Sequence, residues 1–244
     1  QRGYAAIAMD LSGHRPPAPK YDEKGAKIPD AGHDPTTRVR LEKAGVDHGH
    51  AQKFDCIGGP VDNDWPYHAV ANVMKAHTLL RSFPGVDPER TAVTGISWGG
   101  YTTCLAASLD NRFKAAVPVY GCGFLHEGES VQKPSIDKLG DRRAAWIAAY
   151  DPSSHLGKGS VPMFWVNGTH DIHYPLDSHA KSAALPKGAR AFRIQPRMAH
   201  GHPPGWAPKE IGIFVDSLLK GGIPLPEVGE MLVEGGTVSV PVQS

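Results

Sequence analysis

Residues 91–109 read TAVTGISWGGYTTCLAASL, and this stretch decides how the rest of the chain is interpreted. A short apolar run ends at Gly95-Ile96-Ser97-Trp98-Gly99, and a segment of small residues follows it. The order predicts a strand, a sharp turn and a helix, with the serine projected above the edge of a sheet. Glycine at 95 and 99 lets neighbouring backbone approach where a Cβ would clash. The sequence therefore predicts that Ser97 is a nucleophile.

The helix expected after Ser97 adds a second catalytic feature. Amide groups at the start of a helix point their N–H bonds toward a developing negative charge. We therefore predict that the Trp98 N–H is one donor of an oxyanion hole.

Working outward from this turn, apolar runs alternate with segments of helical periodicity. The expected strands are 4–9, 91–94, 114–120, 161–166 and 191–195, and the expected helices are 67–81, 101–109, 142–150, 179–185 and 209–220. Such alternation predicts an α/β fold, in which a mostly parallel sheet is covered by helices on both faces. Residues 11–35 are rich in Pro, Gly and charge, which indicates a long surface loop.

The composition limits the partners of the protein. The 26 Lys and Arg nearly balance the 25 Asp and Glu, so no basic surface for nucleic acid or anionic membrane is expected. No window approaches the roughly 20 apolar residues of a spanning helix. Three cysteines are too few for a disulfide framework. A small-molecule or carbohydrate substrate fits this composition best, and nothing in the sequence indicates an oligomeric state.

The chain divides into two parts. Residues 1–222 carry the alternating pattern and are assigned to one catalytic domain. Residues 223–244 form a tail whose end alternates polar residues with Val238, Val240 and Val242, the period of a half-buried strand. The tail is predicted to be the start of an appended β domain.

An acidic partner for Ser97 is expected after a later strand. Proteins with this strand–turn–helix serine motif carry their catalytic groups in the chain order serine, acid, histidine. Asp171 follows the strand predicted at 161–166 and is the favoured residue. A carboxylate there would hold the histidine in one tautomer and stabilise its cation. Asp151 precedes a proline and resembles a turn residue, while Asp177 suits a helix cap. Both remain alternatives.

The base is expected between the last strand and the last helix. That segment holds His200 and His202. His200 lies nearer the strand, and the glycine after it would free the backbone to turn the ring toward Ser97. We favour His200 and keep His202 as the alternative. Tyr174, like Trp98, lies close in sequence to an expected catalytic residue and is a candidate for the pocket wall.

A metal centre is not expected. His48 with His50 and His170 with His173 lack the HExxH motif or i, i+4 helical spacing of a zinc hydrolase.

These motifs also carry a family resemblance. RGYAAIAMDLSGH, the run DPERTAVTGISWGGYTTCLAASLDNRFKAAVPVYG, VPMFWVNGTHDIHYPLDS and RMAHGHPPGW resemble the acetyl xylan esterase and dipeptidyl-aminopeptidase (prolyl-oligopeptidase)-like branch of the α/β-hydrolases, over about residues 1–222. The resemblance implies hydrolysis through an acyl-enzyme by Ser97, Asp171 and His200, without a cofactor. It also implies a further strand between 4–9 and 91–94, so the chain is expected to lack its first strands and its second oxyanion donor.

Three functions follow from the resemblance. The favoured one is an esterase acting on acetylated carbohydrate, such as xylan, or on another small ester; a polysaccharide substrate would imply a secreted or periplasmic protein. The alternative enzyme is a serine peptidase of the prolyl-oligopeptidase type, which normally carries a propeller domain. A non-catalytic hydrolase-like binding module is the alternative of another class, but such modules usually lose a member of the triad.

Overall fold

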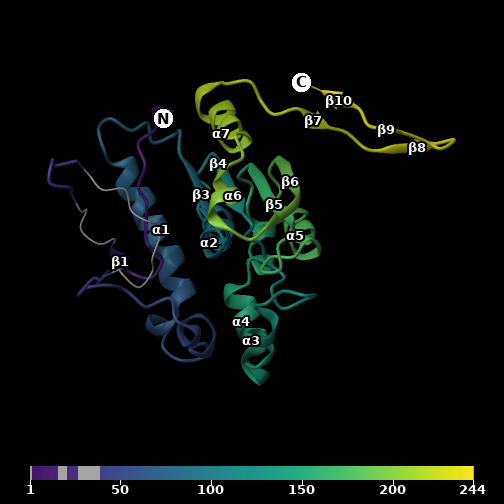
Figure 1. Ribbon diagram of the computed structural model, residues 1–244. Coiled ribbons are helices and arrows are strands. Elements are labelled where there is room, and N and C mark those ends of the chain that lie inside the picture. Colours follow the sequence, from purple (N-terminus) through teal and green to yellow (C-terminus); the bar gives the residue numbers. More distant parts are fainter. Residues whose placement is uncertain (1, 16–20, 27–38, 244) are drawn as a thin grey trace.

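A four-stranded parallel sheet forms the centre of the protein (Figure 1). The computed structural model describes residues 2–15, 21–26 and 39–243. Its strands β3 (Ala92–Ile96), β4 (Ala115–Val119), β5 (Met163–His170) and β6 (Arg190–Ala199) lie side by side in chain order. All three strand pairs are parallel, which confirms the predicted α/β architecture.

Burial explains which of these runs form inner strands. All five residues of β4 and the first six of β5 are buried, as expected for apolar strands with a neighbour on each side. The outer strand β6 instead alternates between exposed and partly buried residues over most of its length. The core of the protein therefore lies on and around β4 and β5.

Helices cover both faces of the sheet. Phe164 stacks on Phe214 of α7 (Glu210–Lys220), while its neighbour Trp165 packs edge-on against His179 of α5 (Leu176–Ala183). Consecutive residues of a strand point to opposite faces, so α5 and α7 lie on opposite sides of β5. This confirms the prediction of a doubly covered sheet.

The remaining elements lie around this core. The helices are α1 (Trp65–Arg81), α2 (Trp98–Leu109), α3 (Lys133–Asp137), α4 (Arg143–Tyr150) and α6 (His202–Trp206). Single turns are η2 (Ala51–Asp55), η3 (Val61–Asn63), η4 (Gly140–Arg142), η5 (Pro152–Ser154) and η6 (Leu156–Lys158), and a two-residue pairing joins β1 (His14–Arg15) to β2 (Val39–Arg40). Among the described residues, none of the helices has the length and apolar character needed to span a bilayer. Much of the loop predicted at 11–35 lies outside the described residues.

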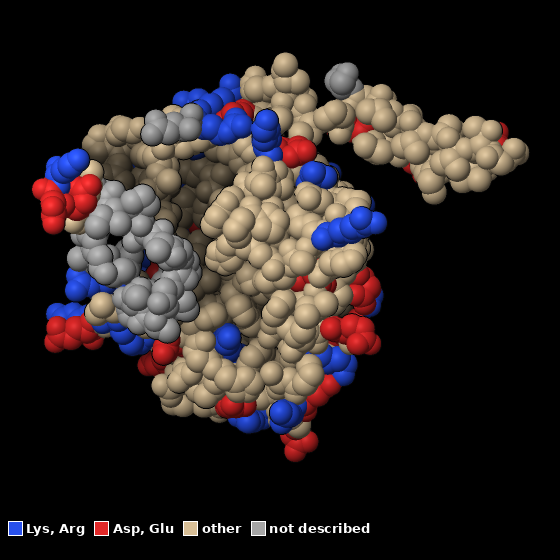
Figure 2. All heavy atoms as spheres, in the orientation of Figure 1, with Lys and Arg blue, Asp and Glu red and all other residues tan. Residues whose placement is uncertain are grey.

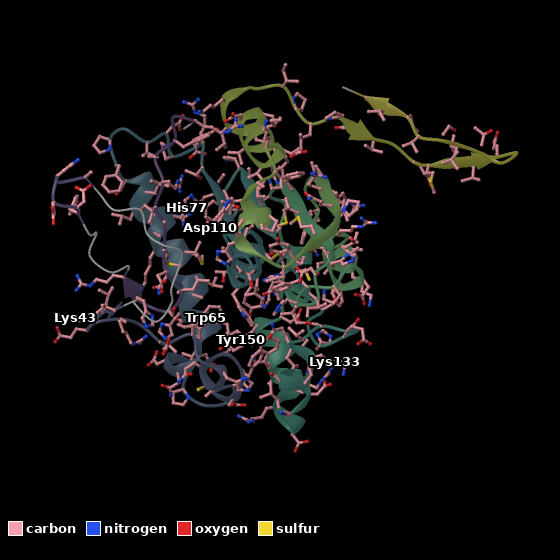
Figure 3. All side chains as sticks on the ribbon, in the orientation of Figure 1. Lys43, Trp65, His77, Asp110, Lys133 and Tyr150 are labelled. Atoms are coloured by element: carbon pink, nitrogen blue, oxygen red, sulfur yellow. The ribbon has the colours of Figure 1, made fainter. Side chains whose placement is uncertain are left out.

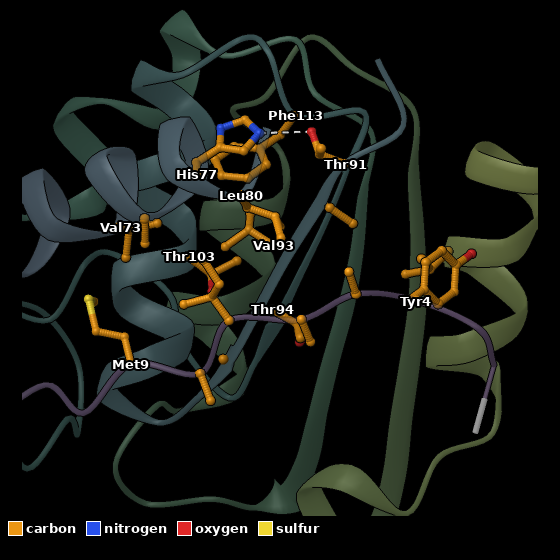
Figure 4. Close-up of a pocket in the computed structure, with 18 of the residues that line it drawn as sticks. Tyr4, Met9, Val73, His77, Leu80, Thr91, Val93, Thr94, Thr103 and Phe113 are labelled. Atoms are coloured by element: carbon orange, nitrogen blue, oxygen red, sulfur yellow. Dashed lines mark hydrogen bonds between the residues drawn. The ribbon is translucent and has the colours of Figure 1, made fainter. Parts of the chain in front are cut away.

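The strand predicted at 4–9 is wrong. This segment is largely exposed and has no regular structure. A groove of about 780 Å³ lies between it and β3, with α1 and α2 contributing further walls (Figure 4). A strand requires a neighbour to pair its backbone N–H and C=O groups, and an apolar run alone does not supply one.

The tail also departs from the prediction. It forms strands β7 (Glu227–Val228), β8 (Leu232–Glu234), β9 (Thr237–Ser239) and β10 (Val242–Gln243), paired as two antiparallel ribbons. Every residue of these strands is exposed, so none is half-buried. The ribbons project from the body and carry few charges (Figure 2). Their role as the start of a β domain stays a prediction.

Helix α5 buries a histidine, and this predicts an acid-sensitive fold. Burial lowers the pKa of His179 to about 4, and its Nε2 has no hydrogen-bond partner among the described residues. The unfolded imidazole gains a proton below its usual pKa of about 6.5. The folded one does so only near 4. The contribution of the buried, neutral His179 to stability is therefore fully present above pH 6.5, and it declines as the pH falls toward 4.

We expect His179 alone to reduce the free energy of unfolding by about 2 kcal/mol between pH 7.5 and pH 5. Urea unfolding at both pH values measures this difference. In His179→Leu the pH-dependent loss should shrink by the same amount. An unchanged loss in that variant would assign the acid sensitivity to other groups.

Candidate active site

The carboxyl ends of the parallel strands bring the predicted residues to one edge of the sheet. Ser97 directly follows β3, Asp171 directly follows β5 and His200 directly follows β6. Strand register sets their neighbours: His170 pairs with Ala199, so Asp171 and His200 emerge side by side. The three side chains therefore meet although 74 and 29 residues separate them in the chain.

Ser97 occupies a strained turn between β3 and α2. Its φ is 61° and its ψ is −120°, a conformation that residues with a Cβ rarely adopt. The turn is held by a hydrogen bond from the Ser97 N–H to the Val119 carbonyl, with N and O 3.0 Å apart. Positive φ at a serine between a strand and a helix is the geometry of a nucleophile elbow.

The glycines of the elbow differ in how closely other backbone approaches them. A Cβ on Gly95 would lie 2.4 Å from the carbonyl oxygen of Gly99, and one on Gly100 would lie 2.4 Å from that of Val119. Beyond its chain neighbours and the backbone of its own helix, a Cβ on Gly99 would meet no described atom within 4 Å. The predicted clash is therefore confirmed at 95 and wrong at 99, because the free side of Gly99 faces open space. The second position of the elbow that lacks room for a Cβ is Gly100, which lies against the Val119 carbonyl.

The three polar side chains form a continuous chain of hydrogen bonds. His200 Nε2 lies 2.8 Å from Ser97 Oγ, and its Nδ1 lies 3.0 Å from Asp171 Oδ2. With Nδ1 protonated toward the carboxylate, Nε2 is free to accept the serine proton. The side chain of Asp171 is fully buried and that of His200 is 18% exposed. This arrangement can transfer a proton from the hydroxyl to the imidazole.

The turn after β5 holds Asp171 in place. Its Oδ1 accepts backbone N–H groups of His173 at 2.8 Å and Tyr174 at 3.1 Å. One carboxylate oxygen is thus used by the turn, and the other is left for His200. The ring of His173 also lies 4.4 Å from that of His200, between centroids, and burial lowers the pKa of His173.

The alternative residues lie elsewhere. His202 begins α6 and packs against Trp206, with 5.8 Å between ring centroids. Asp177 is the second residue of α5, whose N-cap is Pro175, so the predicted role of Asp177 as a helix cap is wrong. Asp151 is buried and accepts the backbone N–H groups of Phe124 and Leu125, so it anchors the loop after β4. Neither carboxylate is the hydrogen-bond partner of His200.

Tyr174 and Trp98 both lie beside the triad. Tyr174 has no exposed surface and stacks over the imidazole of His200, with 5.9 Å between ring centroids. Its role as a pocket wall stays a prediction. Trp98 is the first residue of α2, so its N–H has no preceding helical turn to bind. That N–H remains the predicted oxyanion donor.

The indole of Trp98 adjoins a partly buried cationic group that the sequence did not indicate. Lys53 Nζ lies 4.8 Å from the ring centroid, and burial lowers the pKa of this lysine. The His48 ring lies 5.9 Å from the same indole, between centroids. Burial lowers the pKa of His48 to about 4. These groups flank the residue after Ser97 with one ammonium and one neutral imidazole.

A second hydroxyl–imidazole–carboxylate arrangement occurs at the opposite end of the strands, where β3 begins. His77 Nδ1 lies 2.9 Å from Asp110 Oδ2, and its Nε2 lies 2.8 Å from Thr91 Oγ1 (Figures 3 and 4). Thr91 precedes β3, whereas Ser97 follows it. All three side chains are buried and Phe113 stacks on the imidazole, so the network ties α1 to the sheet. The sequence placed His77 only within the helix predicted at 67–81.

No cluster of three or more potential metal-binding side chains is formed within the described ranges.

Comparison with known proteins settles the family. Residues 50–212, well over half of the chain, match the model of the prolyl oligopeptidase family. The chain belongs to this family. The matched region contains the elbow and all three residues of the hydrogen-bonded chain, so the family assignment and the site concern the same segment.

Of two relatives of this prolyl oligopeptidase family member, one is named as an ester hydrolase and the other as a peptidase. It is 29% identical to a probable carboxylic ester hydrolase, LipM, of Mycobacterium tuberculosis, over 47% of this chain and 32% of the relative. It is 26% identical to an uncharacterized peptidase, YuxL, of Bacillus subtilis, over 53% of this chain and 20% of the relative. The chain thus spans about a third or less of these relatives.

Solved structures support the fold. An acetyl xylan esterase from Paenibacillus sp. R4 superimposes with a TM-score of 0.58 at 19% identity, over 64% of this chain and 54% of that one. At this identity the likeness shows the α/β-hydrolase fold alone.

Proposed function

We propose that this protein is a serine hydrolase that cleaves carboxylic esters through an acyl-enzyme. The observation that carries the proposal is the geometry of Ser97, His200 and Asp171, with hydrogen bonds of 2.8 and 3.0 Å around one imidazole. Acyl transfer through a serine uses a nucleophile, a base and an orienting acid in this order.

The chemistry has two halves. His200 accepts the Ser97 proton as Oγ attacks the carbonyl carbon, and Asp171 stabilises the imidazolium. The Trp98 N–H, at the positive end of α2, donates to the oxyanion. His200 then protonates the departing alcohol. Water attacks the acyl-enzyme in the same way and releases the acid, which regenerates Ser97.

An ester is the proposed substrate, with an acetylated carbohydrate as the first class to test. The name of the ester-hydrolase relative supports the choice of an ester. The family and the second relative favour the alternative, a peptidase that cleaves amide bonds. The same three residues serve either reaction, because the bond cleaved is selected by groups around the triad.

The first test is covalent labelling with a fluorophosphonate probe, followed by peptide mapping. We expect the label on the peptide that contains Ser97, and we expect Ser97→Ala to reduce labelling to background. Ser108→Ala is the matched control, because this buried hydroxyl donates within its own helix to Cys104 O. Labelling of Ser97→Ala at the wild-type rate would contradict the proposed nucleophile.

Substrate class is tested next with p-nitrophenyl acetate, acetylated xylan and peptide p-nitroanilides. Ester turnover that depends on Ser97, with no anilide turnover, supports the esterase. Faster cleavage of the anilides would instead support the peptidase.

A further inference from the structure

Tyr120 occupies the one strand end that the proposed triad leaves out. It directly follows β4, as Ser97 follows β3, Asp171 follows β5 and His200 follows β6. The pairing of Ile96 with Val119 sets Tyr120 beside Ser97. The sequence placed this residue only at the end of the strand predicted at 114–120. Its place in the sheet puts it between the nucleophile and the acid–base pair.

The backbone of Tyr120 is strained. Its φ of 66° lies in the left-handed region, which a bulky aromatic residue rarely adopts. The strand pairing is nevertheless kept, because its N–H donates to Val166 O at 2.7 Å. A strained residue persists only where its surroundings over-determine it. The contacts of the side chain show what those surroundings are.

The phenol is anchored to the loop that carries the imidazole. Its hydroxyl donates to Gly201 O at 2.9 Å and approaches Ala199 O at 3.3 Å, the two carbonyls that flank His200. Its ring lies 4.6 Å from the imidazole, between centroids. A Cβ on Gly205 would lie 3.0 Å from Tyr120 Cε2, so α6 closes over the other part of the ring. The side chain has no exposed surface.

We propose that Tyr120 is a positioning residue that holds the imidazole of His200 between Ser97 and Asp171. This inference rests on the proposed function, in which His200 is the base. The hydroxyl fixes the backbone on both sides of the histidine, and the phenol ring limits the rotation of the imidazole. Both restraints are needed because Nε2 and Nδ1 must each keep a hydrogen bond near 3 Å at once. Burial raises the pKa of Tyr120, so the hydroxyl keeps its proton at neutral pH.

The test compares two buried tyrosines that differ in their neighbours. Tyr120→Phe removes the hydroxyl and keeps the ring. Tyr101→Phe is the matched control, because Tyr101 is equally buried and its hydroxyl donates to a backbone carbonyl, Tyr150 O, at 2.6 Å. Both variants lose one buried hydrogen bond, so similar shifts of the melting temperature are expected.

The expected difference is kinetic. Tyr120→Phe should lower kcat for ester hydrolysis and the rate of fluorophosphonate labelling by roughly 10- to 100-fold, with KM nearly unchanged, because a misplaced base slows the reaction step. Tyr101→Phe should retain the wild-type rates. Equal rates in both variants would overturn the positioning role.

A second readout does not depend on turnover. We expect the proton between His200 Nδ1 and Asp171 Oδ2, which lie 3.0 Å apart, to give a low-field resonance in proton NMR. We expect it to broaden or move in Tyr120→Phe and to stay unchanged in Tyr101→Phe. An unchanged resonance in both variants overturns the inference even if the protein hydrolyses no ester. Labelling that is independent of Ser97 would contradict the proposed function instead, so the two failures are distinguishable.

Discussion

His200→Ala is expected to lower kcat/KM for an activated ester by about 10⁴-fold or more, because the variant has no base for the Ser97 proton. The geometry is specific: Nε2 of this histidine lies 2.8 Å from Oγ, and its other nitrogen faces Asp171. Steady-state hydrolysis of p-nitrophenyl acetate measures the effect. Loss of the base should also reduce fluorophosphonate labelling at neutral pH.

His202→Ala is the matched control. This histidine lies two residues further on, in the first turn of α6, and its ring packs on Trp206 rather than on the triad. We expect its rate to stay within about threefold of wild type, in the range of substitutions outside a catalytic unit. The reverse result, a large loss in His202→Ala alone, would assign the base to His202.

Gly95→Ala is expected to destabilise the fold strongly. The added methyl would lie 2.4 to 2.8 Å from three backbone atoms of Gly99, and backbone at the start of a helix cannot move aside as a side chain would. We expect at least about 3 kcal/mol of destabilisation. For a protein of this size this corresponds to a fall in melting temperature of roughly 6 °C or more. Thermal unfolding followed by circular dichroism measures it.

Gly99→Ala provides the comparison within the same motif. Its added methyl would meet no described atom within 4 Å beyond its chain neighbours and its own helix backbone, and alanine is favoured over glycine inside a helix by about 1 kcal/mol. The variant should therefore melt at or above the wild-type temperature. If both variants melt alike, the close approach at Gly95 does not determine the stability of the elbow.

Some elements followed directly from local patterns. The strand, turn and helix at 91–109 carry their own apolar run, glycines and small residues, and the structure has them as β3 and α2. The apolar runs at 114–120 and 161–166 became the buried strands β4 and β5. Local patterns succeeded here because each run has a neighbouring strand to pair with.

Other elements depended on partners that the local pattern does not name. The run at 4–9 is as apolar as β4, but a groove lies between it and β3 and it stays irregular. The alternating tail forms strands, but in the described part of the chain they pair only with each other, and their residues are exposed. Hydrophobic pattern reports a preference for burial, whereas strand formation also requires hydrogen-bond partners.

Local sequence patterns were enough to establish the type of fold, the elbow around Ser97 and the small set of residues that could be its acid and base. The tertiary structure alone decided which of them meet. Ser97 and His200 are 103 residues apart, and their contact arises from the order and register of β3, β4, β5 and β6. The same register places Tyr120 in that group. Chain-local patterns specify elements, but a 3 Å contact between distant residues is set by how those elements pair.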